Sequence, residues 1–241
     1  MIDDHFVNHE LESILLKTIK QDIPPAMNRK VNKGGYFSSI RLIICYIDVF
    51  GFLYTGRSNS DSAVKFIRDY FGRFYFKYGE IPGLIYSIYR HGTIHIFKPK
   101  YFIINNRKYA NIIGKELDLV NSIDNTKFQF RQRFGDTVFQ HLIPINVKPI
   151  TYPKNFDTSI ENWFPCSLPK LYNDLLSSVE AFINDIKINS ELNEIVQQSI
   201  RKYRKYHEFK LNKSKEVIEI SPIENKRNKR KYISFHELSK W

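Results

Sequence analysis

The stretch IPGLIYSIYRHGTIH, residues 81–95, carries the clearest structural and chemical pattern of the chain. Pro82 suits the first turn of a helix, because its missing N–H would have no partner there. The apolar residues that follow recur at the spacing of one helical face: Leu84, Ile85 and Ile88. This segment runs directly into the polar sequence RHGTIH, residues 90–95, so the pattern predicts a helix that leads into a basic, histidine-rich end.

Several helices are predicted on either side of this stretch. Before it, helical periodicity covers about residues 7–19, 36–54 and 62–71, with Gly56 and Gly72 as stop signals and N-cap candidates at 58–61. After it, a helix is predicted to begin near Leu168, and a last helix to run from Glu191 to about Tyr206. The helix near Leu168 has a continuous apolar stripe: Leu171, Leu175, Val179, Phe182 and Ile186.

Between these helical regions the pattern favours strands. Residues 96–104 look extended, and Asn105 and Asn106 form a turn signal. Residues 127–134 alternate between polar and phenylalanine side chains, as a half-buried strand requires, and residues 138–147 are expected to pair with them. Residues 148–169 contain four prolines and are predicted to form a winding connector.

The predicted fold is therefore mainly α, with a β-rich insertion after the motif, and α+β overall. Residues 1–100 and 168–208 are expected to form a helical bundle, and 101–167 the β-rich insertion and Pro-rich connector. Residues 209–241 are predicted to be a basic C-terminal tail, because residues 201–241 hold 13 Lys and Arg against 5 Glu.

Charge and cysteine content narrow the class of protein. The net charge of +12 favours polyanionic partners, although an AT-rich coding bias also produces many lysines. The two cysteines argue against a disulfide framework, and Cys45 is expected to be a small buried hydrophobe. No secretory signal is visible, and the apolar run 40–53 is judged too short and too charged for a membrane span. These features predict a cytoplasmic protein without a membrane partner.

Arg90 and His95 are the best candidates for catalysis. A histidine can transfer a proton near neutral pH, and a guanidinium can stabilise the charge that develops on a phosphate in a transition state. The chain has no P-loop and no GxGxxG, and Cys166 has no adjacent base in the sequence. No cofactor is therefore expected.

The stretch resembles the HEPN superfamily of small helical domains, many of which are metal-independent ribonucleases in toxin–antitoxin and antiviral systems. The family signature is an arginine followed, after four to six residues, by a histidine, with a polar residue directly after the arginine. Arg90 and His95 match this spacing, and His91 occupies the polar position. The resemblance covers about residues 5–100 and implies a helical bundle and a homodimer.

The resemblance also implies a mechanism and partners. His95 would act as general base or acid, Arg90 would bind the scissile phosphate, and His91 would orient or share the proton transfer. The substrate would be RNA, the product a 2′,3′-cyclic phosphate, and an antitoxin or defence-complex protein a further partner. Basic residues after the motif are candidates for RNA binding: Lys98, Lys100, Arg107, Lys108, Lys127, Arg131 and Arg133.

Two features depart from the family pattern. Gly92 lies inside the predicted helix, and Phe97 stands where one HEPN branch has a tyrosine, so no hydroxyl is present for nucleotide modification. On a straight α-helix, moreover, residues five apart point about 140° away from each other, so Arg90 and His95 would not share a face.

Three alternatives therefore stay open. In the first, Arg90 is a surface cation and the two histidines belong to the core. In the second, His91 and His95 bind zinc, although no further ligands are nearby in the sequence. In the third, the chain is a non-catalytic helical module that binds nucleic acid or a partner protein through its basic surface.

Overall fold

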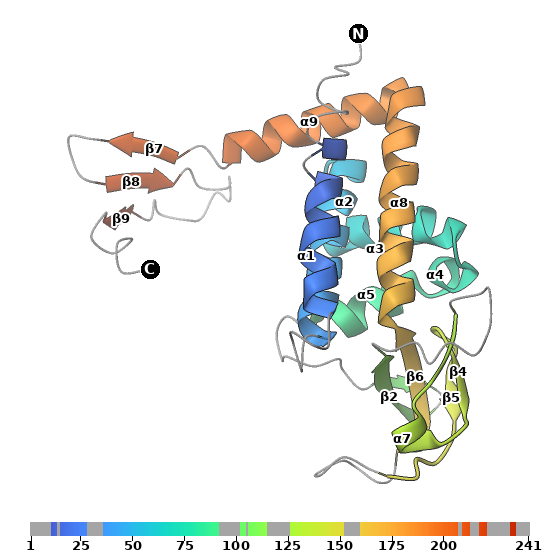
Figure 1. The fold of residues 1–241 in the computed structure, drawn as a ribbon. Helices are drawn as coiled ribbons and strands as arrows, with labels where there is room; N and C mark the ends of the chain where they lie inside the picture. Colours follow the sequence, from blue (N-terminus) through green and yellow to red (C-terminus); the bar gives the residue numbers. More distant parts are fainter. Residues whose placement is uncertain are drawn as a thin grey trace.

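The central helix, α2 (Tyr36–Thr55), contacts most of the other helices. The computed structural model describes residues 11–13, 15–27, 36–91, 102–104, 106–114, 126–151, 160–206, 209–212, 217–220 and 232–234. Within these ranges the protein is a mixed α+β structure, in which a helical bundle stands on a smaller β-rich region (Figure 1). The predicted α+β class is therefore confirmed at this level.

The apolar sequence of α2 is explained by its place in the core. Ile40, Ile43, Ile44 and Phe50 have no exposed surface, and α1 (Lys17–Met27), α3 (Ser60–Asp69), α8 (Leu168–Ile188) and α9 (Ser190–Tyr206) pack around the helix. By length and composition alone, residues Phe37–Thr55 pass the test for a helix that could cross a membrane, and part of this stretch is buried inside the bundle. Burial inside a bundle gives a helix the same composition.

Local signals explain where the first helices begin and end. α1 continues past the predicted end near residue 19 to Met27, with Pro24 and Pro25 in its last turns. Gly56 closes α2 with a φ of +70°, a left-handed conformation that glycine adopts without strain. Asn59 caps α3, because its side chain accepts a hydrogen bond from the backbone N–H of Ser62 at 3.0 Å.

Four short turns connect α3 to the motif. They are the 3₁₀ turn η2 (Phe71–Arg73), α4 (Phe76–Glu80), α5 (Pro82–Tyr86) and η3 (Ser87–His91), the last of which is a π-helix. Pro82 occupies the first turn of α5, as predicted. α4 was not predicted, and α3 ends at Asp69 instead of at the predicted Phe71.

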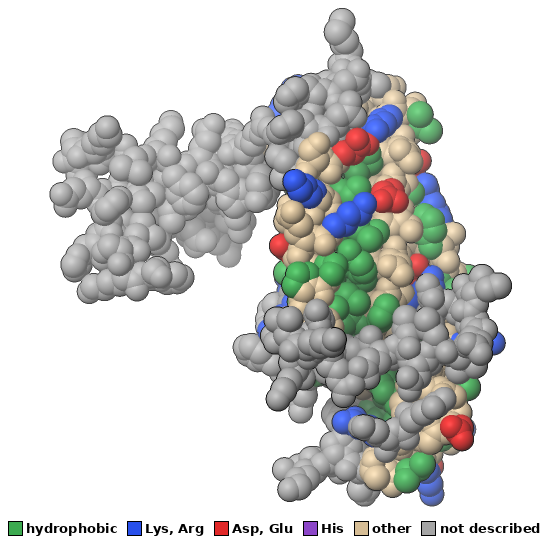
Figure 2. Space-filling model, in the orientation of Figure 1, with side chains coloured by type: hydrophobic (Ala, Val, Ile, Leu, Met, Phe, Trp, Pro, Cys, Tyr) green, Lys and Arg blue, Asp and Glu red, His purple; other side chains and the backbone are tan. Residues whose placement is uncertain are grey.

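The long helix α8 closes the bundle. All five residues of its predicted stripe are buried, and Phe182 makes edge-to-face contacts with Phe50, Tyr54, Phe66 and Tyr70 of α2 and α3. Hydrophobic side chains run along the seam between α1 and α8 in Figure 2, below a group of charged side chains. The ion pair Lys20–Glu180 joins α1 to α8, and Lys187 of α8 pairs with Glu12, which precedes α1.

The β-rich region contains two sheets. The larger has the order β1 (Phe102–Ile104), β2 (Arg107–Gly114), β6 (Asn162–Ser167) and β5 (Ile145–Asn146), with β2 and β6 parallel and the outer pairs antiparallel. The smaller pairs β3 (Lys127–Gln129) with β4 (Val138–Gln140), which confirms the predicted pairing of these segments. After α9, β7 (Phe209–Asn212), β8 (Val217–Ile220) and β9 (Tyr232–Ser234) form a third sheet.

The strand β6 joins the two hydrophobic cores, because its successive side chains point to opposite faces. Trp163 packs in the core of the β-rich region, whereas Phe164 and Cys166 pack in the core of the helical bundle. The sequence placed this segment in a winding connector because Pro165 argues against an inner strand. That prediction was wrong, and β6 runs directly into α8.

Two further predictions need correction. The strand expected over 127–134 ends at Gln129, because residues Arg131–Phe134 form the short helix α7. Residues 209–241 are not described throughout, but the described parts are strands, which the prediction of a basic tail did not include.

Candidate active site

Arg90 lies in η3, where it faces the middle of α2. Its Nε donates a hydrogen bond to Asp48 Oδ2 at 2.8 Å, and the hydroxyl of Tyr86 donates to Asp48 Oδ1 at 2.7 Å. One carboxylate thus holds both the guanidinium and the phenol. A carboxylate that accepts two such hydrogen bonds fixes the direction of each donor.

This cluster is half-buried and polar. The side chains of Arg90 and Asp48 are 28% and 31% exposed, and Nη1 of Arg90 is buried without a hydrogen-bond partner among the described residues. Burial, reinforced by Asp48, raises the pKa of Tyr86 to about 12. Burial lowers the pKa of Arg90, but Asp48 and Tyr86 more than offset this, so the net shift is upward. The guanidinium is therefore charged at every physiological pH.

The neighbouring residue Tyr89 holds η3 from the opposite side. It has no exposed surface, and its hydroxyl interacts with the thiol of Cys166 on β6. Burial raises the pKa of Cys166 to about 12, so this thiol is not a nucleophile near neutral pH. Arg90 therefore joins η3 to α2, and its sequence neighbour Tyr89 joins η3 to β6.

Of the predicted catalytic residues, the structure describes the whole of Arg90 and the backbone of His91. His91 is the last residue of η3, and its side chain, like the whole of His95, lies outside the described residues. Lys98 and Lys100 also lie outside them.

The remaining predicted RNA-binding residues belong to the β-rich region. Arg107 and Lys108 are exposed on β2, Lys127 is exposed on β3, and Arg133 is exposed on α7. Arg131 begins α7, and its side chain is not among those described. The structure therefore distributes these cations over β2, β3 and α7.

Sequence reasoning missed Asp48 and Tyr86 and misjudged Cys45. Asp48 was visible as an acid inside an apolar run, which is the signal of a buried charge with a partner. Cys45 is exposed on α2, one turn before Asp48, and is not a buried hydrophobe. Burial, with the charge of Asp48, raises its pKa, while Arg90 lowers it.

A second polar cluster is completely buried at the junction of the bundle and the β-rich region. The Ser167 N–H donates to Nδ1 of His141 at 2.9 Å, and Nε2 of His141 lies 2.8 Å from the Tyr78 hydroxyl. Burial and the charge of Lys170 hold the pKa of His141 well below its ordinary value. Because the ring is closed off from solvent, we assign it to structure.

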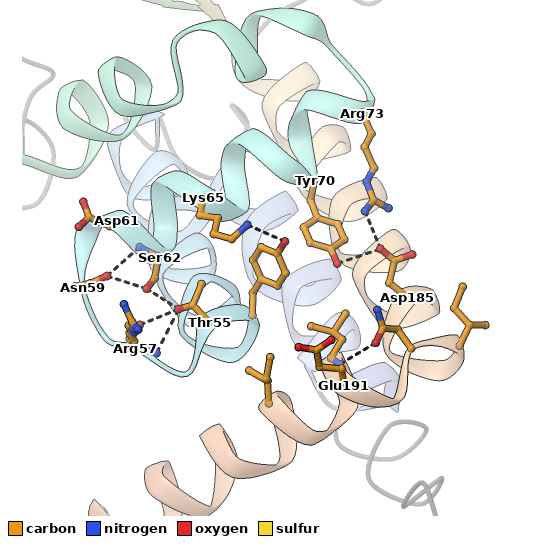
Figure 3. A pocket seen from close by; sticks show the side chains of 15 residues that line it. Thr55, Arg57, Asn59, Asp61, Ser62, Lys65, Tyr70, Arg73, Asp185 and Glu191 are labelled. Atoms are coloured by element: carbon orange, nitrogen blue, oxygen red, sulfur yellow. Dashed lines mark hydrogen bonds and ion pairs between the residues drawn. The ribbon is translucent and has the colours of Figure 1, made fainter.

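A surface groove of about 800 Å³ lies along α3, between this helix and the corner where α8 meets α9 (Figure 3). Arg73 donates to Asp185 at 2.7 Å, and Lys65 pairs with Asp69. The groove is lined by three cations, Arg57, Lys65 and Arg73, and by three carboxylates, Asp61, Asp185 and Glu191. The groove as a whole is thus lined by as many cations as carboxylates.

Within the described residues, no group of three or more His, Cys, Asp or Glu side chains could hold a metal ion. Comparison of the chain with protein-family models, with curated proteins and with solved structures gave no match. The function therefore has to be argued from the site itself.

Proposed function

We propose that the protein is a metal-independent endoribonuclease of HEPN type. His95 would act as general base on a ribose 2′-hydroxyl or as general acid on the leaving oxygen, Arg90 would bind the scissile phosphate, and His91 would assist the proton transfer. The product would carry a 2′,3′-cyclic phosphate. The resemblance also leads us to propose a cytoplasmic homodimer, with an antitoxin or defence-complex protein as a further partner.

The observation that carries the proposal is the state of the Arg90 guanidinium. A guanidinium has five N–H donors; Asp48 accepts a hydrogen bond from Nε, and Tyr86 also hydrogen-bonds to the guanidinium. Nη1 is buried without a partner, which costs about 1–3 kcal/mol for an ordinary polar group and more for a charged one. A phosphate oxygen is the acceptor that such a donor binds most strongly. The site therefore holds an arginine in place with hydrogen-bonding capacity to spare.

The π-helical winding of η3 bears on the spacing of the motif. In a π-helix the hydrogen bonds join residues five apart, so residues at i and i+5 lie one above the other. Arg90 and His95 have this spacing in the sequence, but η3 ends at His91, and the winding of residues 92–95 lies outside the described residues. Single π-turns are frequent at functional sites.

The competing proposal is a non-catalytic module that binds nucleic acid or a protein. The Arg90–Asp48 ion pair favours it, because the carboxylate neutralises the charge that a phosphate would otherwise meet. In this alternative the pair joins α2 to η3 and has only a structural role.

The two proposals differ in one experiment. Purified protein is incubated with unstructured RNA in the presence of EDTA, and the 3′ ends of the products are analysed. We expect cleavage to 2′,3′-cyclic phosphate ends, no cleavage of DNA of the same sequence, and a loss of at least about 100-fold with Arg90→Ala or His95→Ala. Arg68→Ala, an exposed arginine of α3 paired only with its neighbour Asp69, is the matched control. Cleavage that survives both substitutions, or its absence from the wild type, favours the binding module.

A further inference from the structure

We infer that the C-terminal end of α9, together with the loop before α3, forms a second contact surface for the phosphate backbone of RNA. The described cations of this surface are Arg57 in the loop and Arg201 and Lys202 in α9. This inference rests on the proposed function, since it extends the path of the same substrate beyond Arg90.

The charges of α9 are divided along its length. Glu191 and Glu194 lie in its first two turns, where the helix packs against the bundle, whereas residues 201–206 read RKYRKY and contain four cations and no acid. Arg201 and Lys202 are exposed, and this end of α9 extends beyond the bundle in Figure 1. Four like charges within two turns repel one another, so they suit a polyanionic partner.

The helical period places Arg201 and Lys202 away from the packed side of α9. At 3.6 residues per turn, positions 201 and 202 lie on the exposed side of the helix, together with Glu194 and Gln198. The positions that α9 buries fall on the other side: Leu192, Asn193, Val196 and Ser199. Arg201 and Lys202 therefore lie on the side of the helix that α9 does not use for packing.

The loop before α3 adds a third described cation, Arg57, to this surface. Nζ of Lys202 donates a hydrogen bond to the carbonyl oxygen of Gly56 at 3.4 Å, which brings the side of α9 against the residue next to Arg57. Arg57 is exposed, and within the described part of the chain none of Arg57, Arg201 and Lys202 forms an ion pair.

α2 connects this surface to the candidate active site. Asp48, which holds Arg90, and Gly56 are eight residues apart, or about 12 Å along a helix axis. Phe52 is half-buried and lies between them on the same face of α2, and the neighbouring exposed residues, Cys45 and Val49, are uncharged. A distance of about 12 Å corresponds to three or four nucleotides of a stacked strand, at about 3.4 Å each. A single strand would therefore reach from Arg90 to the basic surface.

The test measures binding separately from cleavage. A fluorescent single-stranded RNA with 2′-O-methyl groups throughout cannot be cut, and its affinity for the full-length protein is measured between about 50 and 200 mM salt. The triple variant Arg57→Gln, Arg201→Gln, Lys202→Gln is compared with Lys17→Gln, Lys20→Gln, Lys148→Gln, which removes three exposed cations from α1 and from the segment after β5. Circular dichroism and urea unfolding verify that both variants fold.

We expect the slope of log affinity against log salt to become shallower by about 2 in the first variant, since each single-strand phosphate contact contributes about 0.7. The control should change it much less. An equal effect of the two variants on the slope would overturn the inference. An unchanged slope with a less stable helix would overturn it too, because the cations would then only stabilise the C-terminal end of the α9 dipole. Binding to anionic lipid vesicles without RNA binding would overturn it as well.

The same experiment separates this inference from the proposed function. If the wild type does not cut ordinary RNA but binds the 2′-O-methyl strand with a slope that depends on Arg57, Arg201 and Lys202, the ribonuclease proposal fails and the binding surface stands. If RNA is cut and neither the slope nor the affinity depends on these residues, the surface fails and the proposed function stands.

Discussion

Asp48 is the residue on which the candidate site depends. It accepts hydrogen bonds from Arg90 and from Tyr86, so it links α2 to α5 and η3. Because it would act through Arg90 and not on the substrate, we regard it as a positioning residue. An ion pair at about 30% exposure is screened in part by water, so its effect on geometry outweighs its effect on stability.

The positioning role leads to a prediction. We expect Asp48→Asn to lower the free energy of unfolding by about 1–2 kcal/mol and RNA cleavage by at least about 10-fold, because the neutral amide no longer fixes the guanidinium. Tyr86→Phe is the matched control: it removes the other hydrogen bond to the same carboxylate and leaves the ion pair. Urea unfolding and single-turnover cleavage are measured on both variants. If Asp48→Asn and Tyr86→Phe lose the same cleavage activity and have the same stability, Asp48 has only a structural role.

At the scale of elements, the close crossing of α2 and α3 sets the shape of the bundle. A Cβ on Gly51 would lie 2.7 Å from the Cα and the backbone N of Ala63, a distance that real side chains do not reach. Thr55 and Ser62 are joined at the same crossing by a hydrogen bond between their hydroxyls, 2.6 Å long. The two helices therefore touch backbone to backbone.

This crossing gives the second prediction. Gly51→Ala should lower the free energy of unfolding by about 1–3 kcal/mol, since the helices must move apart. Gly83→Ala, in α5, is the control, because a Cβ there meets nothing within 4 Å and alanine favours a helix by about 0.5–1 kcal/mol. Thermal and urea unfolding measure both. A neutral Gly51→Ala variant would show that the two helices separate easily.

At the scale of the whole molecule, the buried cluster around His141 joins the bundle to the β-rich region. His141 follows β4, Tyr75 donates to its carbonyl oxygen at 2.7 Å, and Ser167 lies at the end of β6. The next residue, Leu142, is buried with a φ of +58°, a left-handed conformation that costs a non-glycine residue energy. Its N–H donates to Pro165 O at 2.7 Å, and this contact helps to hold the turn.

The depressed pKa of His141 predicts how stability depends on pH. The His141 imidazole takes up a proton near its ordinary pKa of 6.5 in the unfolded chain, whereas the buried imidazole of the folded protein does not. The free energy of unfolding is therefore undiminished above that pH and falls as the pH drops below it. Below pH 6.5, His141 should lower the free energy of unfolding by up to about 1.4 kcal/mol for each pH unit.

Urea unfolding at a series of pH values checks this prediction. His141→Gln cannot titrate, so we expect its stability to depend less steeply on pH below 6.5 than that of the wild type. The difference between the two curves isolates His141 from Asp174, whose pKa burial raises and whose effect has the opposite sign. Parallel curves would mean that the imidazole is accessible to protons in the folded state. NMR titration of the ring in the wild type gives an independent answer.

The sequence by itself determined the longer helices, because their signals are local. The spacing of the apolar residues in α8, Pro82 at the start of α5 and Gly56 at the end of α2 each act within a few residues of the chain. Arg90 was found in the same way, as part of a short motif. The pairing of β3 with β4 was predictable for the same reason, since the two strands are close in the sequence.

Only the tertiary structure decided what lies opposite each of these elements. Asp48 meets Arg90 across 42 residues, and β2 pairs with β6 across a long connection, so neither contact has a local signature. Pro165 and Cys45 were misjudged because burial, not local preference, decides whether a proline joins an inner strand or a cysteine of an apolar run reaches the surface. Packing is a property of distant residues brought together, and a pattern read along one chain does not contain it.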